Sequence, residues 1–114
     1  MRIAIVDDLV NERALLRNRL EQALNGRSVQ TDICEYANGE AFIQAAEKQR
    51  FSAAFLDIYM PGANGIDTAR ALRAFDPDCL LIFTTTSTDH ALEGFQVRAM
   101  HYLVKPFTQK DIDS

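Results

Sequence analysis

Five residues in this sequence have side chains that could act together on a phosphoryl group and a metal ion. They are the paired acids Asp7 and Asp8, a third acid Asp57, the hydroxyl of Thr85 and the ammonium of Lys105. Three carboxylates brought together without a cation would repel one another, and one of them would have to take up a proton. A hard divalent ion removes this conflict, and oxygen ligands suit Mg²⁺ or Mn²⁺. The set contains no histidine or thiol, which argues against zinc.

A carboxylate beside such an ion has a definite chemical use. An aspartate such as Asp57 can attack phosphorus and form an aspartyl phosphate. The transferring group needs its oxygens neutralised from more than one side, and positioning does most of the remaining work. The metal would supply one side, Lys105 a point charge on the other, and Thr85 a hydroxyl donor. A backbone N–H from the loop after Asp57 would complete the shell.

Each of these residues also has a simpler interpretation when it is taken alone. Asp7 or Asp8 could cap the helix that follows, and Asp57 could be a turn former at the end of a strand. Thr85 could be a helix cap or part of a hydroxyl turn, and most single lysines are solvated. The hypothesis of a joint site therefore depends on their common placement, each at the end of a predicted strand.

Short apolar runs predict the strands that would position these residues. Apolar, β-branched runs of this length are typical of strands that are covered on both faces. The second run alternates more and is expected nearer an edge of the sheet. The predicted strands are residues 3–6, 29–36, 53–56, 79–83 and 100–104.

Between these runs, apolar residues recur at helical spacing. Asn38 and Asn64 are expected as N-caps of the second and third helices, and Gly26 as the stop of the first. In the fourth helix, Ala91 and Leu92 are expected to face inward together with Phe95. The predicted helices are residues 10–25, a segment from Asn38, a segment from about Gly65, residues 89–97, and a segment capped by residues 108–111.

Five repeats of strand followed by helix predict an α/β fold. Such alternation implies a doubly wound, five-stranded parallel sheet with right-handed crossovers. We expect the flavodoxin-like strand order 2-1-3-4-5, in which the first and third strands are neighbours and all strand-to-helix turns lie at one end. Residues 1–114 are expected to form one domain. Its fifth helix is truncated, because the seven residues after Phe107 would make only about two turns.

Composition excludes several other classes of protein. The formal net charge is −4 and there is no basic block, which argues against binding to nucleic acid through its phosphates. No window of about 18 apolar residues exists, so no membrane span is expected. The chain opens directly into a strand-like run rather than a charged and apolar leader. We therefore expect a cytoplasmic domain without membrane contact.

Four motifs, taken together, resemble the receiver domains of two-component response regulators. The resemblance covers essentially the whole chain, and the combination is much more specific than the acid pair alone. The motifs are Ile5-Val6-Asp7-Asp8, Leu56-Asp57-Ile58-Tyr59-Met60-Pro61 with Asn64-Gly65, Phe83-Thr84-Thr85, and Tyr102-Leu103-Val104-Lys105-Pro106.

The resemblance implies a role for each residue around the phosphoacceptor. Asp57 is expected to accept a phosphoryl group from a sensor histidine kinase. Asp8 is expected to bind Mg²⁺ (or Mn²⁺) directly, Asp7 partly through water, and Asp57 and the carbonyl oxygen of Tyr59 to complete the protein ligands. Lys105 is expected to pair with the phosphoryl group, and its bond to the following proline is usually cis in this family.

The resemblance also implies a switch and an output. Thr85 is expected to move to the phosphoryl group, and the ring of Tyr102 to turn inward with it. This changes the surface formed by the fourth helix, the fifth strand and the fifth helix. The runs 91–97 and 102–107 resemble receivers that precede a LytTR-type DNA-binding domain. That effector domain is not in this chain, and a homodimer is a further partner that the family allows.

Two features depart from the family pattern. Thr86 stands where a smaller residue usually follows the switch threonine, so it is expected to narrow access to Asp57 and alter phosphotransfer and hydrolysis rates. The short fifth helix removes part of the usual output surface, so a dimer formed by this segment alone need not be the native one.

Three other functions compete with a phosphorylation switch. A pseudo-receiver would use the same fold as an unphosphorylated docking module, but the complete set of acids, Thr85 and Lys105 argues against it. A phosphohydrolase of the haloacid dehalogenase type would place an Asp-x-Asp at the end of the first strand, where this chain has Asp7-Asp8. A flavin-binding electron carrier would need a phosphate-binding loop that these two acids would repel. We therefore expect a switch that catalyses only its own phosphotransfer and dephosphorylation and turns over no external substrate.

Overall fold

A five-stranded parallel sheet forms the centre of the computed structural model, which describes residues 1–27, 30–86, 89–106 and 108–113. The strand order is β2-β1-β3-β4-β5, and each neighbouring pair is parallel. This confirms the predicted flavodoxin-like sheet. The strands are β1 (Arg2–Val6), β2 (Asp32–Tyr36), β3 (Ala53–Asp57), β4 (Leu80–Thr85) and β5 (His101–Val104).

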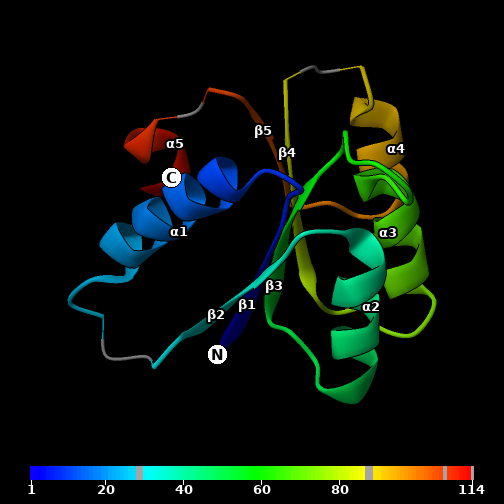
Figure 1. Cartoon of the computed structure of the whole chain (residues 1–114), viewed down its shortest axis with the longest axis horizontal. Coiled ribbons are helices and arrows are strands. Elements are labelled where there is room, and N and C mark those ends of the chain that lie inside the picture. The colour runs from blue at the N-terminus through cyan, green and yellow to red at the C-terminus, as the bar shows by residue number, and fades with distance from the viewer. Residues whose placement is uncertain (28–29, 87–88, 107, 114) are drawn as a thin grey trace.

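Helices cover both faces of the sheet, as Figure 1 shows. Helices α1 and α5 lie on one face, and α2, α3 and α4 lie on the other. This is the arrangement that right-handed crossovers on a doubly wound sheet require. The helices are α1 (Val10–Leu24), α2 (Gly39–Lys48), α3 (Gly65–Arg73), α4 (Ala91–Gln96) and α5 (Gln109–Asp113).

The sheet divides the core into two apolar layers. Alternate residues of a strand point to opposite faces. In β1, Ile3 and Ile5 therefore belong to the layer under α1, whereas Ala4 and Val6 belong to the layer under α2 and α3. Burial on both faces explains why the central strands are continuous apolar runs rather than alternating ones. The strands that carry the acids are thus fixed from both sides.

The predicted helix ends are confirmed by side-chain caps. The Asn38 carboxamide oxygen accepts from the backbone N–H of Ala41 at 2.8 Å, and the Asn64 oxygen accepts from that of Asp67 at 2.9 Å. After α1, Gly26 adopts a positive φ of 81°, the conformation in which glycine commonly ends a helix.

Some boundaries differ from those predicted. β2 begins at Asp32 rather than at Val29, which lies outside the described residues. β4 runs on to Thr85, so the strand itself carries this residue to the edge of the sheet. Among the described residues, helix α5 comprises Gln109–Asp113. A cavity of about 220 Å³ lies beside Phe55 and Ile112.

The prediction for the inner face of α4 is wrong. Leu92 is 67% exposed and Phe95 is 81% exposed, and Ala91 is exposed as well. The residue that faces the sheet is Gly94, where an added Cβ would lie 3.4 Å from the Phe83 ring. Gly94 is buried and faces Phe83 and Tyr102, whereas the larger apolar residues of the helix lie on its exposed side. Among the described residues, no helix is both long and apolar enough to cross a membrane.

Candidate functional site

Three carboxylates meet at the carboxyl end of β1 and β3. These strands pair with Val6 opposite Leu56, so the next residues, Asp7 and Asp57, leave the sheet side by side. One carboxylate oxygen from each of Asp7, Asp8 and Asp57 lies within 4.8 Å of the other two. Asp7 and Asp57 are only 4% and 5% exposed. The sheet topology therefore produces the acidic cluster that the sequence predicted.

Lys105 inserts its ammonium group among these acids. Its Nζ lies 2.8 Å from Oδ2 of Asp7, 3.7 Å from Oδ1 of Asp57 and 4.0 Å from Oε2 of Glu12. Burial opposes the charged form of this lysine, but the hydrogen bond to Asp7 and the charges of Asp57 and Glu12 outweigh it and raise the Lys105 pKa. The lysine is therefore held charged directly beside Asp57. The peptide bond to Pro106 is cis, as the resemblance implied.

The charge of Lys105 does not bring the pKa of Asp57 down to its ordinary value. Burial raises the pKa of its carboxyl to about 6, and the charge of Asp7 acts in the same direction. Lys105 and a backbone hydrogen bond from Tyr59 lower it, but they do not offset the first two effects. Asp7 accepts the stronger contacts, because its Oδ1 takes the backbone N–H of Leu9 at 2.9 Å while its Oδ2 takes Lys105. Asp57 is the acid left short of positive charge.

The raised pKa of Asp57 predicts that the stability of the fold depends on pH. A carboxyl whose folded-state pKa lies above its ordinary value of 3.8 stabilises the fold below that value, and the stability is lost as pH rises through about 6. Asp57→Asn should therefore raise the free energy of unfolding of the metal-free protein by about 3 kcal/mol at pH 8 and by nothing near pH 3.5. Urea denaturation at several pH values checks this, with the exposed Asp67→Asn as the control for a lost charge. An equal gain at both pH values would contradict it.

Thr85 and Thr86 follow one another with opposite exposure. Thr85 is fully buried and shares the strand face of Phe83, which is also the face against which the Tyr102 ring packs. Its backbone carbonyl accepts from the N–H of Lys105. Thr86 is exposed and lines a cavity of about 310 Å³ with Glu12 and Lys105 among its walls. Thr86 thus borders the space beside the lysine, and its effect on access to Asp57 stays a prediction.

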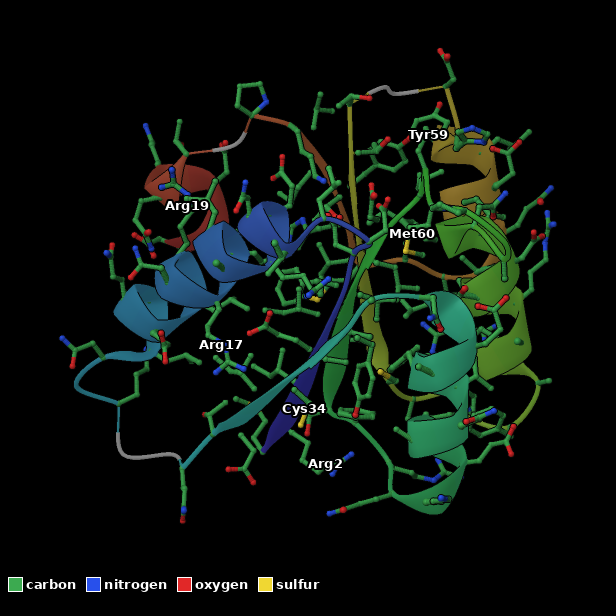
Figure 2. The ribbon with its side chains drawn as sticks, viewed as in Figure 1. Arg2, Arg17, Arg19, Cys34, Tyr59 and Met60 are labelled. Carbon is green, nitrogen blue, oxygen red and sulfur yellow. The ribbon has the colours of Figure 1, made fainter. Side chains whose placement is uncertain are left out.

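The loop between β3 and α3 is fixed from several directions. Gly65 sits so close to the backbone that an added Cβ would collide with the carbonyl oxygen of Asp57. Gly62 has a positive φ of 75°, which favours glycine. Oε1 of Glu40 in α2 accepts the backbone N–H of Ala63 at 3.2 Å. Figure 2 shows Tyr59 and Met60 at this loop, at the same end of the sheet as the acids. The carbonyl of Tyr59 as a metal ligand stays a prediction.

Tyr102 lies partly buried against the core rather than free in solvent. Its ring centroid is 6.3 Å from that of Phe83, with the rings inclined at 60°. Its hydroxyl accepts the backbone N–H of His90 at 3.3 Å. The residue expected to switch is therefore tied to the start of α4.

The donor set of this site fits a hard divalent cation. It offers only carboxylate oxygens and nearby backbone oxygens, which Mg²⁺ and Mn²⁺ prefer. Burial and the charge of Asp7 raise the pKa of Asp57 although Lys105 lowers it, so an added cation would favour the ionised form of this acid. Asp7, Asp8 and Asp57 are the side chains that would hold such an ion.

Two residues at the site were missed from the sequence. Glu12 reaches Lys105 from the first turn of α1, and the Arg13 guanidinium donates to the backbone carbonyl of Asp7 at 2.7 Å. A helix that begins directly after Asp8 must present some first-turn side chains at the same edge of the sheet. That spacing is the signal that could have identified them.

The sequence of this chain is similar to a known protein family and to named relatives. The family model described as the response regulator receiver domain matches residues 3–114. The sensory transduction protein LytT of Bacillus subtilis (strain 168) is 32% identical over 112 residues, which are 98% of this chain and 45% of LytT. The chain spans 33% and 45% of the length of LytT from Oceanobacillus iheyensis and from B. subtilis.

Solved structures share the fold closely. The response regulatory domain of protein mrkE from Klebsiella pneumoniae superposes with a TM-score of 0.87 at 24% identity, over 99% of this chain and 89% of that one. The response regulator TrrA from Thermotoga maritima, in complex with Mg²⁺-BeF, superposes with a TM-score of 0.81 at 29% identity, over 97% and 91% of the two chains.

Proposed function

This chain belongs to the family of response regulator receiver domains, and from that premise we propose that Asp57 is its phosphoacceptor. A sensor histidine kinase donates the phosphoryl group in a reaction that depends on Mg²⁺. The observation that supports this most is the position of Asp57, which lies 3.7 Å from the Lys105 ammonium and within the cluster of Asp7 and Asp8. An acid that only ended a strand would not require a buried lysine and two further carboxylates beside it.

In the proposed reaction, a carboxylate oxygen of Asp57 bonds to phosphorus. The bond from phosphorus to the histidine nitrogen of the donor breaks, and the released imidazole takes up a proton from water. Lys105 pairs with the oxygens of the transferring group, and the hydroxyl of Thr85 donates to one of them. A bound Mg²⁺ would neutralise charge on the phosphoryl oxygens, with Asp7, Asp8, Asp57 and the carbonyl of Tyr59 as its protein ligands.

Asp57 is suited to this role by its lack of strong partners. A carboxylate already held by several hydrogen bonds is a poor nucleophile, since those bonds must be given up in the reaction. Asp7 is in that position, because the backbone N–H of Leu9 and the ammonium of Lys105 both bind it. Asp57 is buried, has a raised pKa of about 6, and remains mostly ionised at neutral pH. We therefore assign ion binding to all three acids and the reaction with phosphorus to Asp57 alone.

Thr85 on β4 and Tyr102 on β5 would carry the signal from Asp57 to the output surface. Movement of Thr85 toward the phosphoryl group opens space on the strand face that Tyr102 shares, and the ring of Tyr102 turns inward. The surface of α4, β5 and α5 changes as a result and acts on an effector domain beyond this chain. The resemblance of residues 91–97 and 102–107 to receivers that precede a LytTR-type DNA-binding domain favours such an effector, and the similarity to the transcriptional regulatory protein LytR of Staphylococcus aureus favours control of transcription. A cytoplasmic location, and turnover limited to the domain's own phosphoryl group, belong to the same proposal.

Incubation with acetyl phosphate tests the proposed chemistry without the unidentified kinase. With Mg²⁺ present, the intact mass should rise by one phosphoryl group, and EDTA should abolish the gain. A protein that takes up nothing with Mg²⁺ would favour the pseudo-receiver instead. Labelling that persists in EDTA would remove the metal from the proposal.

Thr86 gives a further prediction from the cavity beside Lys105. Thr86→Ala shortens an exposed side chain on the wall of that cavity without touching the acids. Labelling by acetyl phosphate, or loss of the label after the donor is removed, should become a few-fold faster, since a single methyl-scale contact is worth about 1 kcal/mol. Thr86→Ser, which keeps the hydroxyl, is the matched control. Unchanged rates in Thr86→Ala would remove the steric role of this residue.

A further inference from the structure

We propose that His90 is a positioning residue that couples the loop after Asp57 to the start of helix α4, through its ring contact with Tyr59. This inference rests on the proposed function for its biological meaning, because it concerns how the state of Asp57 reaches the output surface. The coupling itself is inferred from the contacts of His90 with Tyr59 and Tyr102. It can be tested in the unphosphorylated protein.

The first contact joins two loops that lie far apart in the sequence. The rings of Tyr59 and His90 meet edge to face, with centroids 5.5 Å apart and an interplanar angle of 67°. Figure 2 shows Tyr59 beside the end of α4 at which the helix begins. Tyr59 is also hydrogen-bonded through its backbone to the carboxylate of Asp57. A change at Asp57 is therefore transmitted to Tyr59 by one bond, and from Tyr59 to His90 by one ring contact.

His90 is in turn connected to the residue expected to switch. Its backbone N–H donates to the hydroxyl of Tyr102 at 3.3 Å. Its Nδ1 lies 3.6 Å from Oε2 of Glu93 one turn along α4. A shift of His90 must therefore alter the partner of the Tyr102 hydroxyl. This makes His90 the residue where the phosphoacceptor loop and the switch tyrosine meet.

The two ends of α4 are held with different strength. At the C-terminal end, the Arg73 guanidinium donates to the backbone carbonyl of Val97 at 2.8 Å and to that of Arg98 at 3.3 Å. Hydrogen bonds from a charged donor are about twice as strong as neutral ones. At the other end, His90 makes the ring contact with Tyr59, one hydrogen bond of 3.3 Å to Tyr102 and a 3.6 Å approach to Glu93. Helix α4 should consequently pivot at its C-terminal end and move at the end that His90 holds.

The exposed side of α4 offers little resistance to such movement. Leu92 and Phe95 point to solvent, and Gly94 contributes no side chain to the packing. A six-residue helix is too short to be stable without tertiary contacts. The ring contact at His90 is therefore one of the few side-chain contacts that hold this end of α4.

Hydrogen exchange in the metal-free, unphosphorylated protein tests the coupling by a double-mutant cycle. An edge-to-face aromatic pair is worth about a two- to tenfold change in a local equilibrium. Tyr59→Ala and His90→Ala should each speed amide exchange in α4 by about that factor, and the double variant should be no faster than either one. His90→Phe, which keeps a ring, should resemble the wild type. Leu92→Ala, on the exposed side of the same helix, is the control and should leave the effect of Tyr59→Ala intact.

Two results would overturn the inference. One is unchanged exchange of α4 in Tyr59→Ala. The other is a double variant whose acceleration is the product of the two single effects, because independent residues multiply. The same variants, labelled with acetyl phosphate, show whether the contact affects function: the effect of Tyr59→Ala on the labelling rate should disappear in a His90→Ala background. Failure of the wild type to be labelled would refute the proposed function, while the exchange cycle would still decide the coupling.

Discussion

Asp57→Asn is expected to take up no phosphoryl group from acetyl phosphate, in conditions where the wild type is fully labelled. An amide lacks the nucleophilic oxygen that the reaction needs. Asp7 is poorly placed to replace it, because its carboxylate is bound by Lys105 at 2.8 Å and by the N–H of Leu9 at 2.9 Å. We expect a loss of at least about a hundredfold, the scale seen when a reacting group is removed.

The loss of labelling in Asp57→Asn would not come from unfolding of the variant. The variant removes a buried charge that lies among other negative charges, and it should be more stable than the wild type above pH 6. Circular dichroism and urea denaturation establish that the variant is folded. Asp67→Asn, at an exposed position on α3, should label like the wild type. Label on Asp57→Asn at a comparable rate would place the reactive acid elsewhere.

Lys105→Met is expected to separate ion binding from reaction. Methionine keeps much of the aliphatic length of the lysine but removes its charge, which lies within 4.0 Å of Asp7, Asp57 and Glu12. Removing a group that stabilises developing charge typically slows a reaction by about a hundred- to a thousandfold. The labelling rate should fall on that scale even at saturating Mg²⁺.

Mg²⁺ affinity should change in the opposite direction. The lysine competes with a metal for the same carboxylates, so its loss leaves a more negative site and should strengthen Mg²⁺ binding several-fold. Titration calorimetry measures this change separately from the labelling rate. Lys110→Met removes a lysine at an exposed position of α5 and should alter neither quantity. Weaker Mg²⁺ binding in Lys105→Met would show that the lysine supports the metal site rather than competing with it.

The fold and the meeting of the acids could be predicted from the sequence for a simple physical reason. Parallel strands covered on both faces must be apolar throughout, so Asp7 and Asp57 stand out at the positions where two strands end. Once the strand order puts β1 beside β3, the closeness of these acids follows from strand register. Lys105 is predictable in the same way, because it comes directly after the short strand β5.

Features that depend on packing between side chains could not be predicted. The apolar pattern of residues 91–97 indicated that Leu92 and Phe95 face inward, but in the structure the buried Gly94 faces Phe83 and these two side chains are exposed. The spacing of apolar residues along a helix does not show that a glycine such as Gly94 is the residue that contacts the sheet. The contact of Tyr59 with His90 was missed for a similar reason, since it joins two loops whose relative position is a consequence of the fold. Glu12 lies beside Lys105 because of the angle at which α1 leaves the sheet.

The most direct test of the central claim is to locate the phosphoryl group on the wild-type protein. After labelling with acetyl phosphate and Mg²⁺, borohydride reduces an aspartyl phosphate to homoserine, and the modified residue is identified by peptide mass spectrometry. Our account predicts one homoserine, at position 57, in the peptide between Arg50 and Arg70, and none when EDTA is present. A modified residue at Asp7 or Asp8, or a phosphoryl group on a hydroxyl that survives reduction, would contradict it.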